Sequence, residues 1–582
     1  MNRPLPAPAP EAPAEAPAFP PVRSGPASVA SAPGLRRLRS APQAWPLALG
    51  LAFLAASLTP SLVPRPPLLQ GVLGGLSLAA GYGLGAWAMG FWRAFEMPVL
   101  RGATARGAHL LLGAGALGLL SFCVGHFVLW QNSVRAAVAM EPIVEAQSLA
   151  ILAVAAATFL ALLLAARLAR ALARLLARAM GAFLSPRAAN LLGLLAALAI
   201  LYAATDRGVV RVLFGLADDA FETSAAFFDP EGPPPAEGFR AGGPGSRLDW
   251  GAMGAAGRDF VLSGPDAADI AAFTGRPALQ PLRVYVGREE AETPEARAAA
   301  ALAEMERVGA FDRAVLVLAT PTGTGWLDPG SHDAVEFLHG GDVATVAVQY
   351  SYLTSALALL FETNTGLDQA EALFAAVYDA WAAMPEGERP RLFLHGLSLG
   401  AWASQHAMDP FRMLGDPVDG AFWVGPPFPS DLWRRATAGR EPGSPFVRPR
   451  VGDGRLVRFT DGRAPVSTEG WGGTRILYLQ HASDGVVFYD PATAWRRPDW
   501  LAEPAAPDVS PLMRWTPVVS MVQLALDMAL AKLPPPGFGH NYTADEYIRG
   551  WLAVSEPEGW DEAALARLMA RCGPALDTGC ME

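Results

Sequence analysis

The stretch RLFLHGLSLGAWAS, residues 391–404, decides how the second half of this chain folds. Its apolar residues 392–394 predict a buried strand, and residues 401–407 predict a helix. Gly396, Ser398 and Gly400 lie between them in the G-x-S-x-G pattern of a sharp strand-to-helix turn. Such a turn raises its serine above the sheet edge, so Ser398 is a candidate nucleophile. The alternative is an ordinary glycine-rich turn, since the chain holds 59 glycines.

The sequence around this turn alternates between strand-like and helix-like runs. Apolar runs predict strands, and longer runs at 293–308 and 366–384 predict helices. The predicted strands are 283–286, 314–318, 343–348, 391–395, 420–424 and 475–479. This alternation favours an α/β domain with a mostly parallel sheet covered by helices.

A second glycine-rich loop, TGTGW at 322–326, follows the strand predicted at 314–318. The order of the elements places this loop beside the turn at Ser398. Its backbone N–H groups at Gly323, Thr324 and Gly325, with the N–H of Leu399, are therefore candidate donors for an oxyanion. The alternative is a turn without a chemical role.

A serine nucleophile of this kind needs an acid and then a histidine later in the chain. Asp484 follows the strand predicted at 475–479, and Asp490 is the second choice for the acid. His481 precedes Asp484, so chain order selects His540 as the base. The alternatives are a turn-capping aspartate and a surface histidine.

The first part of the chain has the composition of a membrane protein. The whole sequence is 52% hydrophobic, and its mean hydropathy is positive. We expect five membrane spans of about 20 residues each. Their approximate ranges are 44–63, 68–92, 108–130, 147–166 and 188–205. The second span has glycines at four-residue spacings, which favours close helix packing.

Arginines indicate how these spans are oriented, because positively charged short loops stay in the cytoplasm. Arginines precede the first predicted span, lie between the second and third, and lie between the fourth and fifth. Those after the fourth span, Arg167, Arg170, Arg174 and Arg178, fit either a helix on the lipid surface or an extension of that span. We therefore expect a multi-pass protein of the cell (inner) membrane with its C-terminal domain outside.

Composition predicts four regions along the chain. Residues 1–40 form a Pro/Ala-rich disordered tail, 41–217 a helical transmembrane domain, 218–250 a linker, and 251–582 the catalytic domain. The apolar segment 515–533, between the acid and the base, is a lid, a foot on the membrane or a plain core helix.

The remaining composition argues against other functional classes. A net charge of −10 without a basic run outside the membrane region argues against nucleic acid as a partner. The three cysteines show no metal-ligand spacing, and we expect neither a metal nor a cofactor. Cys572 and Cys580 are expected to pair only if the C-terminal domain is extracytoplasmic.

Five motifs together resemble one known family. SLTPSLVPR at 57–65, TGTGW at 322–326, GLSLG at 396–400, LQHASDG at 479–485 and GHNY at 539–542 are similar to a bacterial family of alpha/beta-hydrolases with a membrane-spanning N-terminal region. The resemblance covers nearly all of residues 40–560. It implies an α/β-hydrolase fold and serine-hydrolase chemistry at Ser398, Asp484 and His540. The chain departs from the general pattern in one respect, because no clear strand is predicted between Asp484 and His540.

These observations predict a membrane-anchored serine hydrolase that cleaves an ester through an acyl-enzyme on Ser398. The membrane anchor favours a lipid or lipid-like substrate, and the bilayer is the expected partner. Three alternatives stay open: an acyltransferase, an amidase or peptidase with the same three residues, and a membrane scaffold or transporter without activity.

Overall fold

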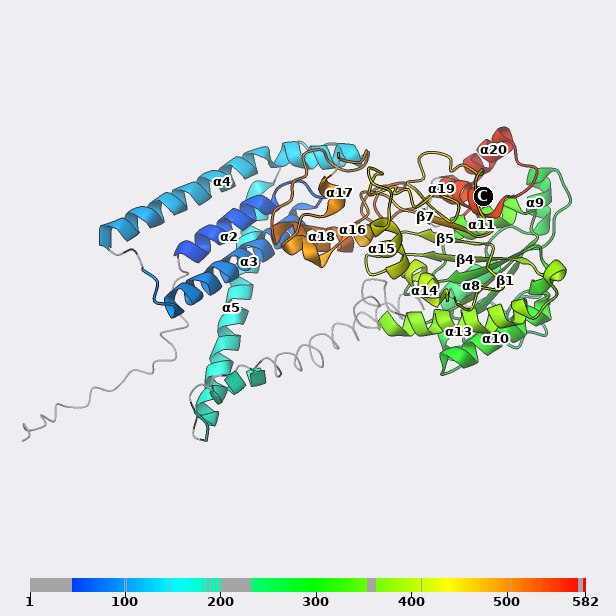
Figure 1. Cartoon of the computed structure of the whole chain (residues 1–582), viewed down its shortest axis with the longest axis horizontal. Coiled ribbons are helices and arrows are strands. Elements are labelled where there is room, and N and C mark those ends of the chain that lie inside the picture. Colours follow the sequence, from blue (N-terminus) through cyan, green and yellow to red (C-terminus); the bar gives the residue numbers. More distant parts are fainter. Residues whose placement is uncertain are drawn as a thin grey trace, which may run out of the picture. The chain divides into compact units, whose positions relative to one another are not determined.

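The computed structural model describes residues 44–581 except 99, 101, 146, 182, 186–187, 190, 194, 198, 200–231, 353–362, 410, 503 and 574–578. An N-terminal group of helices precedes a domain in which strands and helices alternate (Figure 1). The N-terminal helices are α2 (Ala44–Ser57), α3 (Pro67–Ala94), α4 (Gly102–Ala137) and α5 (Ser148–Met180). The predicted tail lies outside the described residues.

The second domain is built on seven parallel strands in the order β1-β3-β2-β4-β5-β7-β6. They are β1 (Leu282–Val286), β2 (Val315–Thr320), β3 (Val343–Val348), β4 (Arg391–Leu397), β5 (Gly420–Val424), β6 (Val457–Thr460) and β7 (Arg475–Leu479). The inner strands are almost entirely buried runs of Val, Leu, Ala and Phe. Such runs are typical of a parallel sheet that is covered on both faces.

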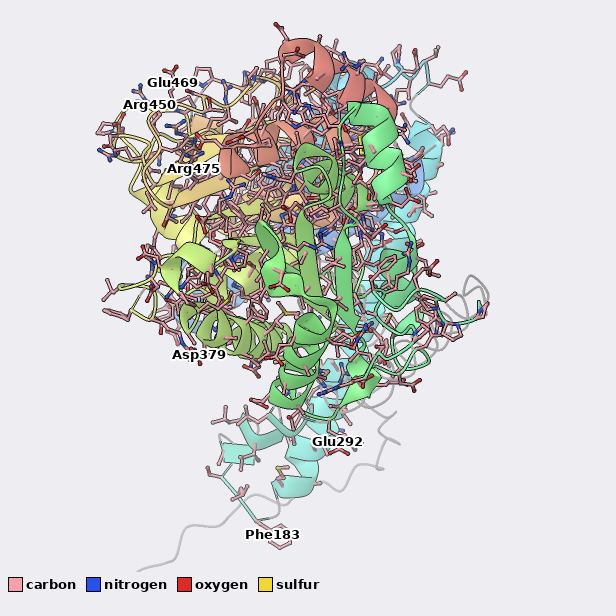
Figure 2. The ribbon with its side chains drawn as sticks, turned by 90° about the vertical axis from the view of Figure 1, so that its right-hand side faces the viewer. Phe183, Glu292, Asp379, Arg450, Glu469 and Arg475 are labelled. Carbon is pink, nitrogen blue, oxygen red and sulfur yellow. A yellow bond between two sulfur atoms is a disulfide. The ribbon has the colours of Figure 1, made fainter. Side chains whose placement is uncertain are left out.

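Helices cover both faces of this sheet (Figure 1). Helices α10 (Pro294–Val308), α13 (Thr363–Ala382) and α14 (Leu399–Ala407) pack in one row, and α11 (Pro329–Leu338), α19 (Ala544–Ser555) and α20 (Glu562–Cys572) in another. The other helices of this domain are α8 (Gly254–Leu262), α9 (Ala267–Thr274), α15 (Asp431–Ala438), α16 (Gly485–Phe488), α17 (Asp499–Ala502) and α18 (Val519–Ala529). Charged side chains such as Asp379, Arg450 and Glu469 project outward from this domain (Figure 2).

The predicted α/β architecture is confirmed, with one addition. All six predicted strands are present, and a seventh strand, β6, which forms the sheet edge and pairs with β7, was not predicted. Its four residues, VRFT, are too short and too polar for a clear strand pattern. The described residues between Asp484 and His540 contain no strand, as the sequence indicates.

Three helices, α3, α4 and α5, are long and apolar enough to cross a membrane. Large apolar side chains on them are exposed, among them Leu110 at 74% and Leu111 at 77%. Phe183, which follows α5, is also exposed and projects away from the chain (Figure 2). Exposed apolar faces of this extent suit lipid rather than water, and they mark a membrane protein.

The predicted spans are partly corrected. The first was expected to reach residue 63, but α2 ends at Ser57 and is about 21 Å long, which is shorter than the apolar core of a bilayer. The arginines from Arg167 to Arg178 lie within α5, so they extend the fourth span as one continuous helix. Half of the fifth predicted span, including all of residues 200–205, lies outside the described residues.

The glycines of α3 allow the close helix packing that their spacing predicts. A side chain at Gly71 or Gly75 would lie within 3 Å of α5, and one at Gly81 would lie within 3 Å of α2.

Two further contacts fix the predicted linker and the C-terminal residues in place. The described part of the predicted linker packs on α10, where Ser246 donates to Glu304 at 2.7 Å. Cys572 and Cys580 form a disulfide.

Candidate active site

The turn between β4 and α14 has a backbone that only this sequence pattern allows. Ser398 has φ 57° and ψ −125°, a strained conformation for a residue with a side chain. A Cβ at Gly396 would lie 2.4 Å from the backbone of Gly400, and a Cβ at Gly400 would lie 2.1 Å from the carbonyl oxygen of Thr320. Both positions therefore require glycine. The turn has the geometry of a nucleophile elbow.

The TGTGW loop lies beside this turn, because Thr320 at the end of β2 pairs with Gly396. Tyr285 Oη donates to the Gly325 carbonyl at 2.8 Å, and Gln349 Nε2 donates to the Thr324 carbonyl at 3.2 Å. These two bonds hold the loop in place from β1 and from the end of β3.

The loop corrects one predicted oxyanion donor. The Gly325 N–H already donates to the Thr322 carbonyl at 2.9 Å, because residues 322–325 form a tight turn. This hydrogen bond removes Gly325 from the set of available donors. The N–H groups of Gly323, Thr324 and Leu399 remain, and Leu399 is the first residue of α14, where helical N–H groups lack intrahelical partners.

Asp484 and His540 meet although they are 56 residues apart, with 2.6 Å between Asp484 Oδ2 and His540 Nδ1. Tyr542 Oη donates to the same carboxylate oxygen at 2.7 Å, and the Val486 N–H donates to Oδ1 at 2.8 Å. Asp484 is fully buried, and His540 is nearly so. His540 Nε2 is buried and has no hydrogen-bond partner among the described residues.

Electrostatics determines which nitrogen of His540 carries the proton. Burial by itself raises the pKa of Asp484, but the positive charge of His540 and three hydrogen bonds outweigh burial, so the pKa lies below its ordinary value. Asp484 is therefore a carboxylate at neutral pH and can only accept. Nδ1 must then donate, so when the imidazole is neutral its lone pair is on Nε2, as a general base requires.

Gly425 connects Ser398 with this histidine. The Ser398 N–H donates to the carbonyl of Val424, the last residue of β5, at 2.9 Å. The next residue, Gly425, has φ 53°, and a Cβ there would lie 2.7 Å from His540 Cε1 and 2.9 Å from Tyr542 Oη. The elbow and the imidazole thus lie on either side of one residue that must be glycine.

Asp490, the second choice for the acid, lies elsewhere. It caps the turn that follows α16 by accepting from the Ala492 N–H at 2.8 Å, and it lies 3.7 Å from Arg496. The structure brings Asp484, and not Asp490, to His540.

Comparison with known families agrees with this geometry. The sequence model of an alpha/beta-hydrolase family matches residues 282–568, and the model of the N-terminus of an alpha/beta-hydrolase family matches residues 58–265. The chain belongs to an alpha/beta-hydrolase family. This membership supports a hydrolase-type function. No curated protein and no solved structure matches the chain.

The hydrolase holds the His540 loop with a second buried pair that the sequence did not reveal. His481 lies 2.7 Å from Glu546 through Nε2 and 2.8 Å from the Gly539 carbonyl through Nδ1. Its ring stacks on Tyr542 at 4.4 Å between centroids. Burial lowers the pKa of His481, but Glu546, Gly539 and Asp508 outweigh burial and raise it to about 9. The motifs LQHASDG and GHNY contain His481 and Tyr542, and they were the only features quoted from the sequence that could have indicated this pair.

Helix α18 connects the site of this hydrolase to its N-terminal helices. The His540 N–H donates to the Ala531 carbonyl just beyond α18 at 2.8 Å, and a Cβ at Gly485 would lie 2.7 Å from the backbone of α18. On its other side, Asp527 accepts from Ser61 Oγ at 2.9 Å, the Leu62 N–H at 3.0 Å and Arg65 Nε at 3.3 Å. The predicted segment 515–533 is therefore a buried supporting helix in contact with the SLTPSLVPR segment.

The described residues contain no group of three or more His, Cys, Asp or Glu side chains arranged as metal ligands.

Proposed function

We propose that this hydrolase is a membrane-anchored serine esterase that cleaves a lipid or lipid-like ester through an acyl-enzyme on Ser398. One observation carries the proposal. The imidazole of His540 is fixed by Asp484 through Nδ1, and its other nitrogen is buried without a partner next to a strained serine turn. An unsatisfied buried nitrogen costs about 1–3 kcal/mol, so its retention at this position supports a function for it.

The proposed reaction follows from these positions. As Ser398 Oγ bonds to the ester carbonyl carbon, His540 Nε2 takes the hydroxyl proton, and the carbonyl oxygen becomes an oxyanion held by the N–H groups of Leu399, Gly323 and Thr324. The bond to the alcohol oxygen then breaks, and the alcohol leaves with the proton from His540. Water attacks the acyl-enzyme in the same way and releases the acid.

The site is proposed to lie on the extracytoplasmic side of the cell membrane. Asp527 contacts Arg65 in the connection between α2 and α3, and the Arg65 N–H donates to Gln131 near the end of α4 at 3.2 Å. The catalytic domain therefore contacts the ends of the spans opposite to the arginine-rich ends, which carry Arg93 and Arg178. The disulfide between Cys572 and Cys580 fits an oxidising compartment.

A fluorophosphonate probe tests the chemistry, since it reacts with activated serines. The full-length protein in detergent is expected to bind the probe covalently and to hydrolyse a short-chain ester, whereas Ser398→Ala should do neither. Ser404→Ala is the matched control, because Ser404 lies on the same α14 and its hydroxyl accepts from Trp423 at 3.0 Å. Labelling of a folded Ser398→Ala protein at the wild-type level would overturn the proposal.

The substrate class needs a separate experiment. Membranes incubated with wild type and with Ser398→Ala are compared by lipid profiling, and a lipid lost only with wild type identifies the substrate. Hydrolysis of amide substrates without hydrolysis of esters would favour the amidase. Transfer of the acyl group to an added alcohol in preference to water would favour the acyltransferase.

Sidedness is tested by labelling introduced cysteines in intact cells with a membrane-impermeant maleimide. Asp379→Cys replaces an exposed residue of the catalytic domain, and Arg174→Cys replaces one in the arginine-rich part of α5. We expect immediate labelling at 379, and labelling at 174 only after permeabilisation. The reverse pattern would place the site in the cytoplasm.

A further inference from the structure

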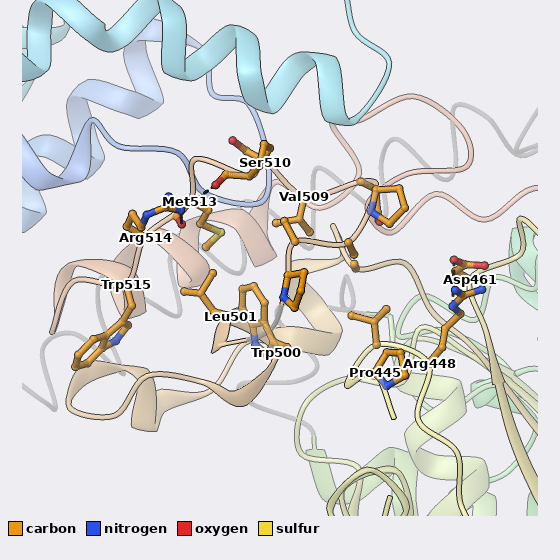
Figure 3. Close-up of a pocket in the computed structure, with 18 of the residues that line it drawn as sticks. Pro445, Arg448, Asp461, Trp500, Leu501, Val509, Ser510, Met513, Arg514 and Trp515 are labelled. Atoms are coloured by element: carbon orange, nitrogen blue, oxygen red, sulfur yellow. Dashed lines mark hydrogen bonds and ion pairs between the residues drawn. The ribbon is translucent and has the colours of Figure 1, made fainter. Parts of the chain in front are cut away.

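A second site is indicated by a cavity of about 650 Å³ that contains neither Ser398 nor His540. Residues from three stretches of the chain line it, 445–448, 497–501 and 504–515, together with Asp461 and Ala482 (Figure 3). A volume of this size is typical of pockets that take small organic ligands.

Its lining combines apolar surface with positive charge. Trp500, Leu501, Val509 and Met513 supply apolar side chains. Arg448, Arg497 and Arg514 also line the cavity. A pocket of this composition suits a molecule with an apolar part and an anionic group.

The charges in the cavity are not balanced. Arg448 lies 3.6 Å from Asp461, and Asp508 is occupied by Arg463 and by two hydrogen bonds from Ser483. Within the part of the chain that the structure describes, Arg497 and Arg514 have backbone carbonyls as hydrogen-bond acceptors and no carboxylate partner. These two guanidinium groups therefore retain N–H donors and a net positive charge for an anion.

The cavity also lies next to a membrane-spanning helix. Ser510, which lines it, is 2.7 Å from Ser133 near the C-terminal end of α4, and Figure 3 shows that helix passing beside Ser510. Helix ends of this kind lie at the level of the lipid headgroups. The molecules available there at high concentration are lipids, and many of them carry a phosphate.

We propose that this cavity binds an anionic phospholipid of the bilayer, with the phosphate on Arg497 and Arg514 and the glycerol and first acyl carbons against Trp500, Leu501 and Met513. The proposal does not require that Ser398 be reactive. The bound lipid would also lie against Ala482, two residues before Asp484. A lipid bound in this cavity would therefore contact the loop that holds the proposed catalytic acid and could change its position.

The test measures lipid binding to the full-length protein in neutral detergent by native mass spectrometry, with phosphatidylglycerol and phosphatidylcholine of the same acyl chains. Wild type is expected to bind phosphatidylglycerol at least tenfold more tightly, since both lipids offer a phosphate to the two arginines but these arginines repel the choline cation of phosphatidylcholine. The double variant Arg497→Gln/Arg514→Gln should lose this preference.

A matched control is the double variant Arg434→Gln/Arg496→Gln. It removes the same charge, and both residues are exposed and lie outside the cavity lining. Its lipid preference should equal that of wild type. Equal binding of the two lipids by wild type, or equal loss in the control, would overturn the proposal.

Two further arms identify the source of the anion. Leu501→Asn places a polar group on the apolar wall and should weaken phosphatidylglycerol binding. Competition by inorganic phosphate at the same concentration as the lipid would show that the cavity takes a free anion, and this result would also overturn the proposal.

Discussion

Two fully buried carboxylates, Asp484 and Asp527, lie on opposite sides of the contact between α16 and α18 and differ in one respect. Asp527 accepts from Ser61, Leu62 and Arg65, and Arg65 in turn donates to Gln70 at 2.9 Å. Asp484 accepts from His540, Tyr542 and Val486, but His540 keeps one nitrogen without a partner.

This difference separates a structural cluster from the cluster proposed to be reactive. Asp527 and Arg65 bond only to protein groups, and a nearby polar atom without a partner, Nε2 of Gln131, is an amide nitrogen that cannot accept a proton. Beside the strained serine turn, the atom without a partner is an imidazole nitrogen that can accept a proton, and we propose that its unfavourable energy is tolerated because the reaction uses it. A third buried cluster, Arg283 with Asp333 and Glu336, follows the structural pattern, with contacts of 2.6 and 2.8 Å.

The largest expected effect comes from Asp484→Asn. An amide donates toward His540 Nδ1 and favours the tautomer with the proton on Nε2, so the base is lost while the shape is kept. If Ser398 reacts as proposed, we expect kcat for ester hydrolysis to fall by about 10⁴-fold, the loss that follows removal of the carboxylate from a Ser-His-Asp triad.

The control is Asp490→Asn, which makes the same chemical change six residues away at a turn cap. It should retain activity within a factor of two or three of wild type. A loss in Asp490→Asn that matches the loss in Asp484→Asn would remove the distinction between the two aspartates.

The second prediction concerns the Asp527 contacts. Asp527→Ala leaves the Arg65 charge buried without a partner, so the unfolding free energy should fall by about 3–5 kcal/mol. The double variant Asp527→Leu/Arg65→Met removes both charges and should recover most of this loss. Chemical denaturation in detergent measures the unfolding free energy of the full-length wild type and of both variants. A double variant that is no more stable than Asp527→Ala would contradict the explanation by an ion pair.

The cluster proposed to be reactive was more predictable from sequence than the structural one. Ser398, Asp484 and His540 follow a local pattern and a chain order that the chemistry imposes, so the sequence was sufficient to propose them, and the contact between Asp484 and His540 agrees with that proposal. The pair of Arg65 and Asp527 spans 462 residues and has no fixed spacing, because only tertiary packing brings the two together. Sequence alone does not reveal such a contact.

Local sequence also failed where backbone geometry decides the outcome. In the sequence, Gly325 is as good a candidate oxyanion donor as Gly323 and Thr324, but its N–H is bonded to the Thr322 carbonyl within the turn at 322–325. Helix α2 ends six residues before the apolar run of the first predicted span does, because Pro60 cannot continue a helix and Ser61, Leu62 and Arg65 turn toward Asp527. The hydrogen bond of Gly325 and the contacts to Asp527 are not encoded in the local pattern.

The third prediction is a pH dependence of stability from His481 and Glu546. The folded-state pKa of His481 is raised from 6.5 to about 9, so the folded state binds the proton more tightly than the unfolded state. This contribution is fully present below pH 6.5 and is lost as the pH rises to about 9. The loss is on the order of 3 kcal/mol. His481→Gln should flatten the curve of unfolding free energy in this window, and a wild-type curve that is already flat there would contradict the assignment.

The smallest expected effect belongs to the disulfide, which ties the C-terminal residues to the third cluster. The Cys580 N–H donates to Asp333 Oδ2 at 2.8 Å, and Arg571 Nε donates to the Cys580 carbonyl at 3.0 Å. The closed loop is short, with a sequence separation of 8, so Cys572→Ser/Cys580→Ser should lower the unfolding free energy by only about 2 kcal/mol. None of these contacts involves Ser398, Asp484 or His540, and kcat should therefore stay at the wild-type value below the unfolding transition. A fall in kcat without a fall in stability would mean that this cluster also supports the reaction.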